Sequence, residues 1–199
     1  MYLRAALSII AGYLLGSLNT SLIVGRFYKV DVRKHGSGNA GMTNTFRTLG
    51  KKAALFVILG DIAKGILAYL AGYYIYGGQP GGLFSGTACI IGHIWPVFFR
   101  FRGGKGVLTT FAVLLMFDWM IALGLFAVFL VILLTTRYVS LGSITAAFLF
   151  PAAAAVFGRG TQTMVFSGII AVIVIAKHHE NIKRLLNGTE SKFSLGNSK

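Results

Sequence analysis

The sequence predicts an all-α integral membrane protein with seven transmembrane helices, its N-terminus outside and its C-terminus in the cytoplasm. Of its 199 residues, 55% are hydrophobic and only 12% are charged, and the mean hydropathy is +0.74. Apolar stretches of about 20 residues, long enough to cross about 30 Å of hydrocarbon as helices, recur along the whole chain. We therefore expect a single polytopic membrane domain that covers residues 1–199.

Basic residues dominate the charge and give a formal net value of +14. In a soluble protein that value would suggest nucleic acid, but here every basic cluster lies between apolar stretches, where it sets membrane topology. We expect a lipid bilayer and no nucleic acid as the surroundings of this chain. The single cysteine, Cys89, lies in an apolar run and can form no intrachain disulfide.

The expected spans follow one another with short polar connections. The first is too long for the core of a signal peptide and has no small-residue cleavage pattern after it, so we interpret it as a retained span. The clear spans are residues 3–24, 53–76, 83–99, 138–157 and 161–176.

Residues 107–136 are ambiguous, because 30 residues of helix would reach about 45 Å, too far for one simple crossing. Asp118 interrupts this stretch near its middle. Two short crossings joined at Asp118 give seven spans, and one long crossing gives six. With seven spans the inner loops hold 16 basic residues and the outer ones hold 2, whereas six spans give 11 against 7. Because lysine and arginine accumulate on the cytoplasmic side, the counts favour seven.

In the seven-span topology three polar segments converge on the cytoplasmic face. The first, residues 35–47, alternates glycines with hydrogen-bond donors, so its backbone N–H groups can curl around an anion. Arg47 adds a planar fork that suits two phosphate oxygens. A solvated connecting loop is the alternative, since these are also ordinary turn residues. The residues concerned are Gly36, Ser37, Gly38, Asn39, Gly41, Thr43 and Asn44.

The second segment, residues 92–107, places Lys105 among Gly103, Gly104 and Gly106. A phosphate could approach this backbone closely with an ammonium group beside it, although the segment is not a Walker loop. Topological stop signals alone would explain the neighbouring arginines but not the three glycines. We therefore expect Lys105 to contact phosphate.

The third segment, residues 177–190, reads as a helix that leaves the membrane. His178 and Asn181 are three residues apart and share a face, while Glu180 and Arg184 are four apart and can pair. We expect no metal site, because the adjacent residues His178, His179 and Glu180 diverge on a helix.

Four polar residues fall inside apolar stretches. Asp61 and Lys64 are three apart and would be unfavourable facing lipid, so we expect them to pair inside the bundle, where either could border the site. Asn19 and His93 are expected to form hydrogen bonds in the interior. A small anion transporter or channel would place its polar chemistry at such mid-membrane positions, and a scaffold would need no phosphate-suited segments. The concentration of polar residues in loops on one side favours an interfacial enzyme.

The three segments carry the motifs GSGNAGMTN with Arg47, GGKG at residues 103–106, and KHHENIKRL at residues 177–185. In this order and spacing the chain resembles the acyl-phosphate:glycerol-3-phosphate acyltransferase family, the PlsY type. The resemblance implies a seven-helix enzyme of the bacterial inner membrane that transfers an acyl group from acyl phosphate to the sn-1 hydroxyl of glycerol-3-phosphate. Its product would be lysophosphatidic acid, for phospholipid synthesis. No cofactor and no obligate protein partner are implied.

The resemblance also implies roles for individual residues. Ser37, Arg47, His178 and Asn181 would be catalytic, and Glu180 would be structural. No histidine has an aspartate five residues later, so a His–Asp mechanism is excluded. The proton of the acceptor hydroxyl could go to His178 or to the substrate's own phosphate, and the sequence leaves both open. The substrate-binding residues would be Gly38, Asn39, Gly41, Thr43, Asn44, His93, Gly103, Gly104, Lys105 and Gly106.

Overall fold

The computed structural model describes residues 1–194, and within them the secondary structure is helical, without a strand. This confirms the predicted all-α class. The chain forms two compact units, Met1–Phe117 and a second one that begins at Asp118. The single domain expected over residues 1–199 stays a prediction.

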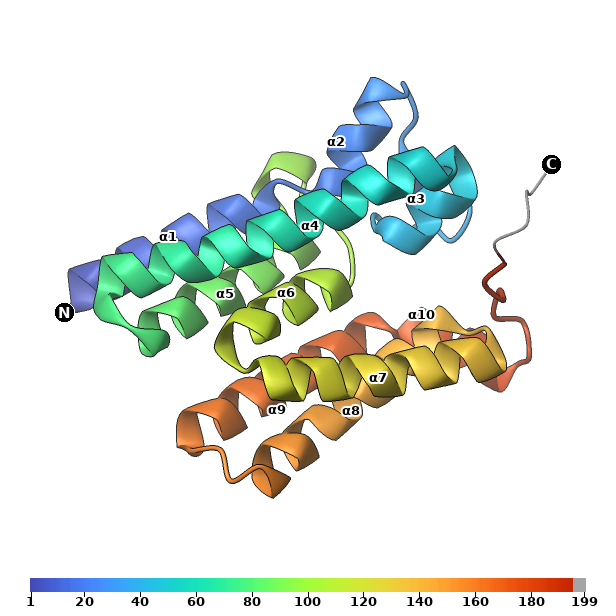
Figure 1. The fold of residues 1–199 in the computed structure, drawn as a ribbon. Coiled ribbons are helices and arrows are strands. Elements are labelled where there is room, and N and C mark those ends of the chain that lie inside the picture. Colours follow the sequence, from blue (N-terminus) through green and yellow to red (C-terminus); the bar gives the residue numbers. More distant parts are fainter. Residues whose placement is uncertain (195–199) are drawn as a thin grey trace. The chain divides into compact units, whose positions relative to one another are not determined.

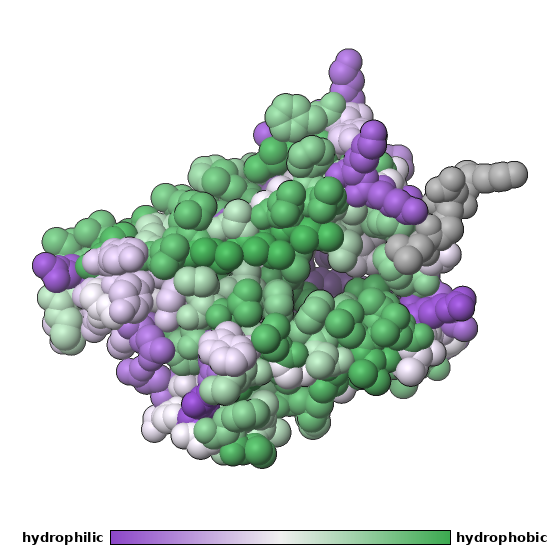
Figure 2. All heavy atoms as spheres, in the orientation of Figure 1, coloured by the Kyte–Doolittle hydropathy of each residue, from purple (hydrophilic) through white to green (hydrophobic). Residues whose placement is uncertain are grey.

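Unit 1 is a bundle of long helices with two short helices near one end (Figure 1). Helix α1 packs against α4 and α5, and α6 packs against the same two helices. Figure 2 shows apolar side chains over the long helices and polar side chains near the end that carries α2 and α3. The helices are α1 (Tyr2–Ser17), α2 (Thr20–Phe27), α3 (Met42–Leu49), α4 (Lys51–Gly72), α5 (Gln79–Ile94) and α6 (Val107–Phe117).

Small residues bring α1 and α5 into close contact. A Cβ atom on Gly12 would lie 2.1 Å from the carbonyl oxygen of Ser85, and one on Gly16 would lie 2.0 Å from that of Cys89. Glycines four residues apart thus let the two backbones touch, a common arrangement between membrane helices. This contact fixes the end of α5 that leads into the second polar segment.

The first predicted span, residues 3–24, is not one helix. The chain breaks at Leu18 and Asn19, and the Asn19 side chain caps α2 by accepting a hydrogen bond of 3.1 Å from the backbone N–H of Leu22. Asparagine is among the best residues for this task, because its short side chain satisfies an N–H that the helix leaves unpaired. Tyr2–Phe27 together remain long and apolar enough to cross a membrane, so the predicted span stands, with a break in its helix.

The described part of unit 2, residues 118–194, contains three long helices and one short helix. Helix α8 packs against both α7 and α9, and α10 continues α9 after a bend of 59°. Asp118 caps α7, accepting from the backbone N–H of Ile121 at 3.3 Å, and also binds Arg159 with an Oδ2–Nε distance of 2.6 Å. The helices are α7 (Trp119–Thr136), α8 (Val139–Val156), α9 (Thr161–Lys177) and α10 (His179–Leu186).

The predicted interruption at Asp118 is confirmed, because α6 ends at Phe117 and α7 begins at Trp119. Among the described residues, five helical stretches are long and apolar enough to cross a membrane, or six if α9 and α10 count as one bent span. Helix α6 is also apolar, but its 11 residues are fewer than the 18 of the shortest of these five stretches. The count of seven spans and the orientation of the termini stay predictions.

Candidate active site

The first polar segment is a loop that leads into α3. Asn44, on the first turn of α3, is 1% exposed and shapes this loop. Its Oδ1 atom accepts from the backbone N–H of Ser37 at 2.8 Å, and its Nδ2 atom donates to the carbonyl oxygens of Val32 at 2.8 Å and His35 at 3.0 Å. Both amide hydrogens are thus used within the loop. Its contacts hold Ser37 in place, and its predicted contact with substrate stays a prediction.

Ser37 lies exposed between two glycines with left-handed backbone angles, Gly36 at φ +58° and Gly38 at φ +72°. Residues with a side chain rarely adopt these angles, so the glycines allow the loop to turn tightly around Ser37. Thr43 and Arg47 follow on α3, half-buried and four residues apart, on one face of the helix. The first segment therefore offers a hydroxyl, exposed backbone and a guanidinium group within a short length of chain.

The second polar segment folds back on the end of α5. The backbone N–H of Gly103 donates to the carbonyl oxygen of Ile94 at 3.1 Å, and that of Gly104 donates to His93 at 3.1 Å. A Cβ atom on Gly104 would lie 2.2 Å from His93 Nε2 and 2.6 Å from the carbonyl oxygen of Ala40. Only glycine fits at this position. Since Ala40 belongs to the first segment, the first and second segments meet, as predicted.

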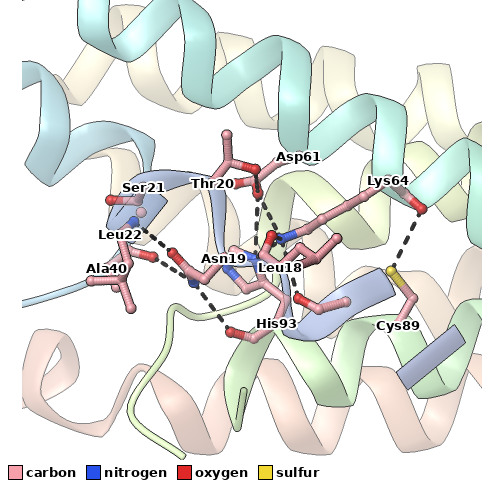
Figure 3. Close-up of polar contacts among 12 residues, drawn as sticks. Leu18, Asn19, Thr20, Ser21, Leu22, Ala40, Asp61, Lys64, Cys89 and His93 are labelled. Atoms are coloured by element: carbon pink, nitrogen blue, oxygen red, sulfur yellow. Dashed lines mark hydrogen bonds and ion pairs between the residues drawn. The ribbon is translucent and has the colours of Figure 1, made fainter. Parts of the chain in front are cut away.

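A buried polar cluster lies beneath this meeting point (Figure 3). Lys64 Nζ is 2.8 Å from Asp61 Oδ1 and 2.8 Å from His93 Nδ1, and Thr20 donates to Asp61 at 3.0 Å. The predicted Asp61–Lys64 pair is confirmed, and His93 forms interior hydrogen bonds as expected. With a side chain 4% exposed, His93 supports the second segment from below. Its predicted contact with substrate stays a prediction.

Arg33, just before the first segment, binds the second segment, and Asp31 holds the Arg33 side chain; the sequence analysis singled out neither residue. Asp31 accepts two hydrogen bonds from the Arg33 side chain, and Arg33 in turn donates to the carbonyl oxygens of Phe99 at 3.2 Å and Arg102 at 3.3 Å. The hydrogen bond from Arg33 lowers the pKa of Asp31 below its ordinary value, so the carboxylate stays ionised. No periodicity could have predicted a contact that joins residues so far apart in the chain.

The third polar segment lies in unit 2, at the bend between α9 and α10. His178 is 2% exposed and Asn181 is 5% exposed. His178 Nδ1 lies 2.7 Å from the carbonyl oxygen of Val174. Because a carbonyl oxygen only accepts, Nδ1 carries the hydrogen, and in the neutral ring Nε2 carries the lone pair that a proton acceptor needs.

Glu190 is the residue of this segment that the sequence reasoning missed. Its Oε1 atom accepts from Asn181 Nδ2 and Ser140 Oγ, each at 2.7 Å, and its Oε2 atom accepts from Arg184 Nε at 2.7 Å. Burial raises the pKa of Glu190, but these three hydrogen bonds outweigh it and leave the pKa below its ordinary value of 4.5. An ionised carboxylate therefore fixes the side chain of Asn181.

Glu180 was expected to pair with Arg184, and that expectation was wrong, because Arg184 pairs with Glu190 instead. The Glu180 side chain is 58% exposed and lies 3.8 Å from Lys183 Nζ. A carboxylate in that position gains little from its partner, since water and salt screen the pair. The structural role that the resemblance gave to Glu180 stays a prediction.

Comparison with known proteins covers almost the whole chain. A family model described as glycerol-3-phosphate acyltransferase matches residues 6–188. The chain belongs to the glycerol-3-phosphate acyltransferase family. Among its relatives, the glycerol-3-phosphate acyltransferase of Thermoanaerobacter pseudethanolicus is 44% identical over 94% of this chain and 95% of its own. That of Trichlorobacter lovleyi is 43% identical over 96% of this chain and 99% of its own.

Solved structures of the same family match the fold. The integral membrane glycerol 3-phosphate acyltransferase PlsY (YgiH), in its glycerol 3-phosphate form, is 39% identical with a TM-score of 0.90, covering 96% of both chains. Its lysophosphatidic acid form gives a TM-score of 0.87 at 38% identity. This glycerol-3-phosphate acyltransferase family member is thus a multi-pass membrane protein of the PlsY type, and the transporter, channel and scaffold interpretations are set aside.

Within the family fold, the predicted site residues divide between the two units. Ser37, Arg47 and Lys105 belong to unit 1, in the two segments that meet at Gly104. His178 and Asn181 belong to unit 2. The convergence of this third segment with the first two stays a prediction.

Proposed function

We propose that this acyltransferase moves the acyl group of acyl phosphate to the sn-1 hydroxyl of glycerol-3-phosphate, forming lysophosphatidic acid and inorganic phosphate in bacterial phospholipid biosynthesis. The observation that carries the proposal is the likeness, along 96% of the chain, to a PlsY solved in glycerol 3-phosphate and lysophosphatidic acid forms. The acyl phosphate donor rests on the motifs in the three polar segments.

The reaction needs two bonds to change. The sn-1 hydroxyl oxygen attacks the acyl carbonyl carbon and forms the new ester bond, while the bond from that carbon to the phosphate oxygen breaks and phosphate leaves with the electron pair. The hydroxyl proton passes to His178 Nε2 or to a phosphate oxygen of the substrate. Acyl phosphate is an activated mixed anhydride with a good leaving group, so positioning and charge stabilisation supply most of the acceleration, and no cofactor is needed.

The glycine-rich segments of unit 1 suit the two phosphates. Phosphate can approach the exposed backbone around Gly38, and Arg47 and Lys105 offset its charge, whereas the buried Gly104 packs the second segment against His93 and Ala40. The acyl chain then stays in the apolar layer while the charged groups remain at the interface. The Ser37 hydroxyl, held in place by Asn44, donates its hydrogen to one of these phosphates or to the acyl carbonyl oxygen.

Asn181 and His178 form the second half of the proposed site. Asn181 donates from Nδ2 to Glu190, and the amide held in this way orients the attacking hydroxyl. Glu190 acts here as a positioning residue for Asn181, in the structural role that the resemblance had assigned to Glu180.

The proposed topology has seven spans in a bacterial inner membrane, with an outer N-terminus and the site facing the cytoplasm. Helix α7 supports it, since its 18 residues cover about 27 Å without α6. Asp118, at the start of α7, pairs with Arg159, just before α9, as expected if both lie on the outer face. The division of 16 inner against 2 outer basic residues supports the same orientation.

A comparison of acyl donors tests the proposal. Purified protein in lipid vesicles receives labelled glycerol-3-phosphate with either palmitoyl phosphate or palmitoyl-coenzyme A, and labelled lysophosphatidic acid is measured. We expect product from palmitoyl phosphate at a rate at least about 100-fold above that from the thioester, because the site is built for two phosphates. Lys52→Met, a change in an exposed residue away from both glycine-rich segments, is the control and should behave as the unchanged protein. Equal rates with both donors would contradict the proposal.

A further inference from the structure

Asn19 is a fully buried side chain that connects three parts of unit 1 (Figure 3). Its Oδ1 atom caps α2 through the N–H of Leu22. Its Nδ2 atom donates to two carbonyl oxygens, that of Ala40 at 3.3 Å and that of His93 at 3.4 Å. One amide group therefore serves a helix end and two distant backbone positions at once.

The two acceptors belong to the two glycine-rich segments. Ala40 lies between Gly38 and Gly41 in the first. The carbonyl oxygen of His93, in the second, also accepts the N–H of Gly104 at 3.1 Å. The Asn19 amide thus bridges the segments at the point where Gly104 packs against Ala40.

Lys64 fixes the position of Asn19 by binding the chain just before it. Lys64 Nζ lies 3.3 Å from the carbonyl oxygen of Leu18 and 3.4 Å from that of Gly16, so the ammonium group satisfies carbonyls that the end of α1 leaves unpaired. The same ammonium binds Asp61 and His93. These contacts hold the break in the chain and one of the two acceptors in a single rigid cluster.

We infer that Asn19 is a positioning residue for acyl transfer: it sets the distance between the two glycine-rich segments and thereby aligns Lys105 with Ser37 and Arg47. This inference rests on the proposed function. Asn19 acts through the backbone of Ala40 and His93, so its loss should disturb phosphate binding even in correctly folded protein.

Asn19→Ser isolates this role, because serine caps helices about as well as asparagine but cannot reach the two carbonyls. At matched amounts of folded protein, KM for glycerol-3-phosphate should rise about tenfold. A partly unfolded enzyme would lose kcat at constant KM, so the rise in KM is a result that a purely structural role would not produce.

Asp118→Ser is the matched control. This change also keeps a helix cap and removes a side-chain contact, the one with Arg159, but it lies in unit 2. The KM of this variant for glycerol-3-phosphate should stay within about twofold of that of the unchanged protein.

A double-mutant cycle with Lys105→Met completes the test. If Asn19 acts by aligning Lys105, Asn19→Ser should lower kcat/KM by less than about threefold further in the Lys105→Met protein, since coupled residues are not additive. Independent effects, or an unchanged KM in Asn19→Ser, would overturn the role of Asn19 and leave the proposed function standing. A Lys105→Met protein with full kcat/KM would overturn the assignment of Lys105, and the inference with it.

Folding is monitored by size-exclusion chromatography and thermal unfolding in detergent. Should Asn19→Ser fail to accumulate, Asn19→Thr, a second capping residue, takes its place with the same expected rise in KM. If neither variant folds, Asn19 serves folding of the bundle, and the positioning role is overturned.

Discussion

Lys105 and Lys51 carry the same charge in different surroundings. Lys105 is half-buried between two glycines, Gly104 and Gly106, of a segment that packs against Ala40, whereas Lys51 is exposed at the start of α4. A half-buried ammonium group can make a short, charge-assisted hydrogen bond to phosphate. An exposed one contributes to a field that salt screens.

Neutralising these two lysines should therefore give different results. Losing a charge-assisted hydrogen bond costs about 1.5–3 kcal/mol, so Lys105→Met should lower kcat/KM for glycerol-3-phosphate by about 10- to 150-fold. Lys51→Met should stay within about twofold. Equal losses at matched expression would mean that the inner basic residues act only as a diffuse field, and Lys105 would not belong to the site.

Replacing His178 tests which group accepts the proton of the acceptor hydroxyl. With Nδ1 held by Val174, Nε2 is the nitrogen suited to accept the hydroxyl proton. If it is the general base, His178→Ala should lower kcat by about 10²- to 10⁴-fold under saturating substrates. A loss under about tenfold would assign the proton to the substrate's phosphate instead.

At the scale of elements, the direction of α10 depends on one carboxylate, that of Glu190, which follows the end of the helix. Glu190 joins Asn181 and Arg184 of α10 to Ser140 near the start of α8. The short helix contributes few apolar contacts of its own, so we expect this hydrogen-bonded group to fix its direction after the bend.

The lowered pKa of Glu190 makes this contribution dependent on pH. A group whose pKa is lower in the folded state stabilises it above the ordinary value, here 4.5, and loses that effect as the pH falls through the folded-state pKa. Glu190→Gln should therefore reduce thermal stability and kcat at pH 7, and the stability difference should shrink as the pH falls below about 4.5. A difference independent of pH, measured by thermal unfolding in detergent, would contradict an ionised Glu190.

Several elements were predictable because local spacing or composition determines them. Asp61 and Lys64 are three residues apart on a helix in an apolar surrounding, where an unpaired charge would be unfavourable, and they pair. Asp118 interrupts an apolar run that is too long for one crossing, and the helix breaks there. The break at Asn19 was missed because the polar run around it, residues 17–21, is short, and Tyr2–Phe27 as a whole stays apolar enough to cross a membrane. Glu190 and Arg33 were missed because their partners come from packing between distant segments.

At the scale of the whole molecule, the topology determines whether the three polar segments can share one face. Six spans would leave the third segment on the side opposite to the first two. Single-cysteine variants at Gln79 and Asn197, made after Cys89→Ala, should label from opposite sides of the membrane if the chain has seven spans. Asn197 lies outside the residues that the structure describes. Labelling of both from the same side, in sealed vesicles with a membrane-impermeant thiol reagent, would overturn the seven-span topology and the shared site.

The most direct test of the proposed acyl transfer is its stoichiometry. Purified protein is incubated with palmitoyl phosphate and labelled glycerol-3-phosphate, and lysophosphatidic acid and inorganic phosphate are measured over the same time course. We expect the two products in equal amounts, no phosphate release when glycerol-3-phosphate is omitted, and a parallel loss of both in Lys105→Met. Phosphate release without lysophosphatidic acid, or at a rate independent of glycerol-3-phosphate, would contradict acyl transfer from acyl phosphate to this acceptor.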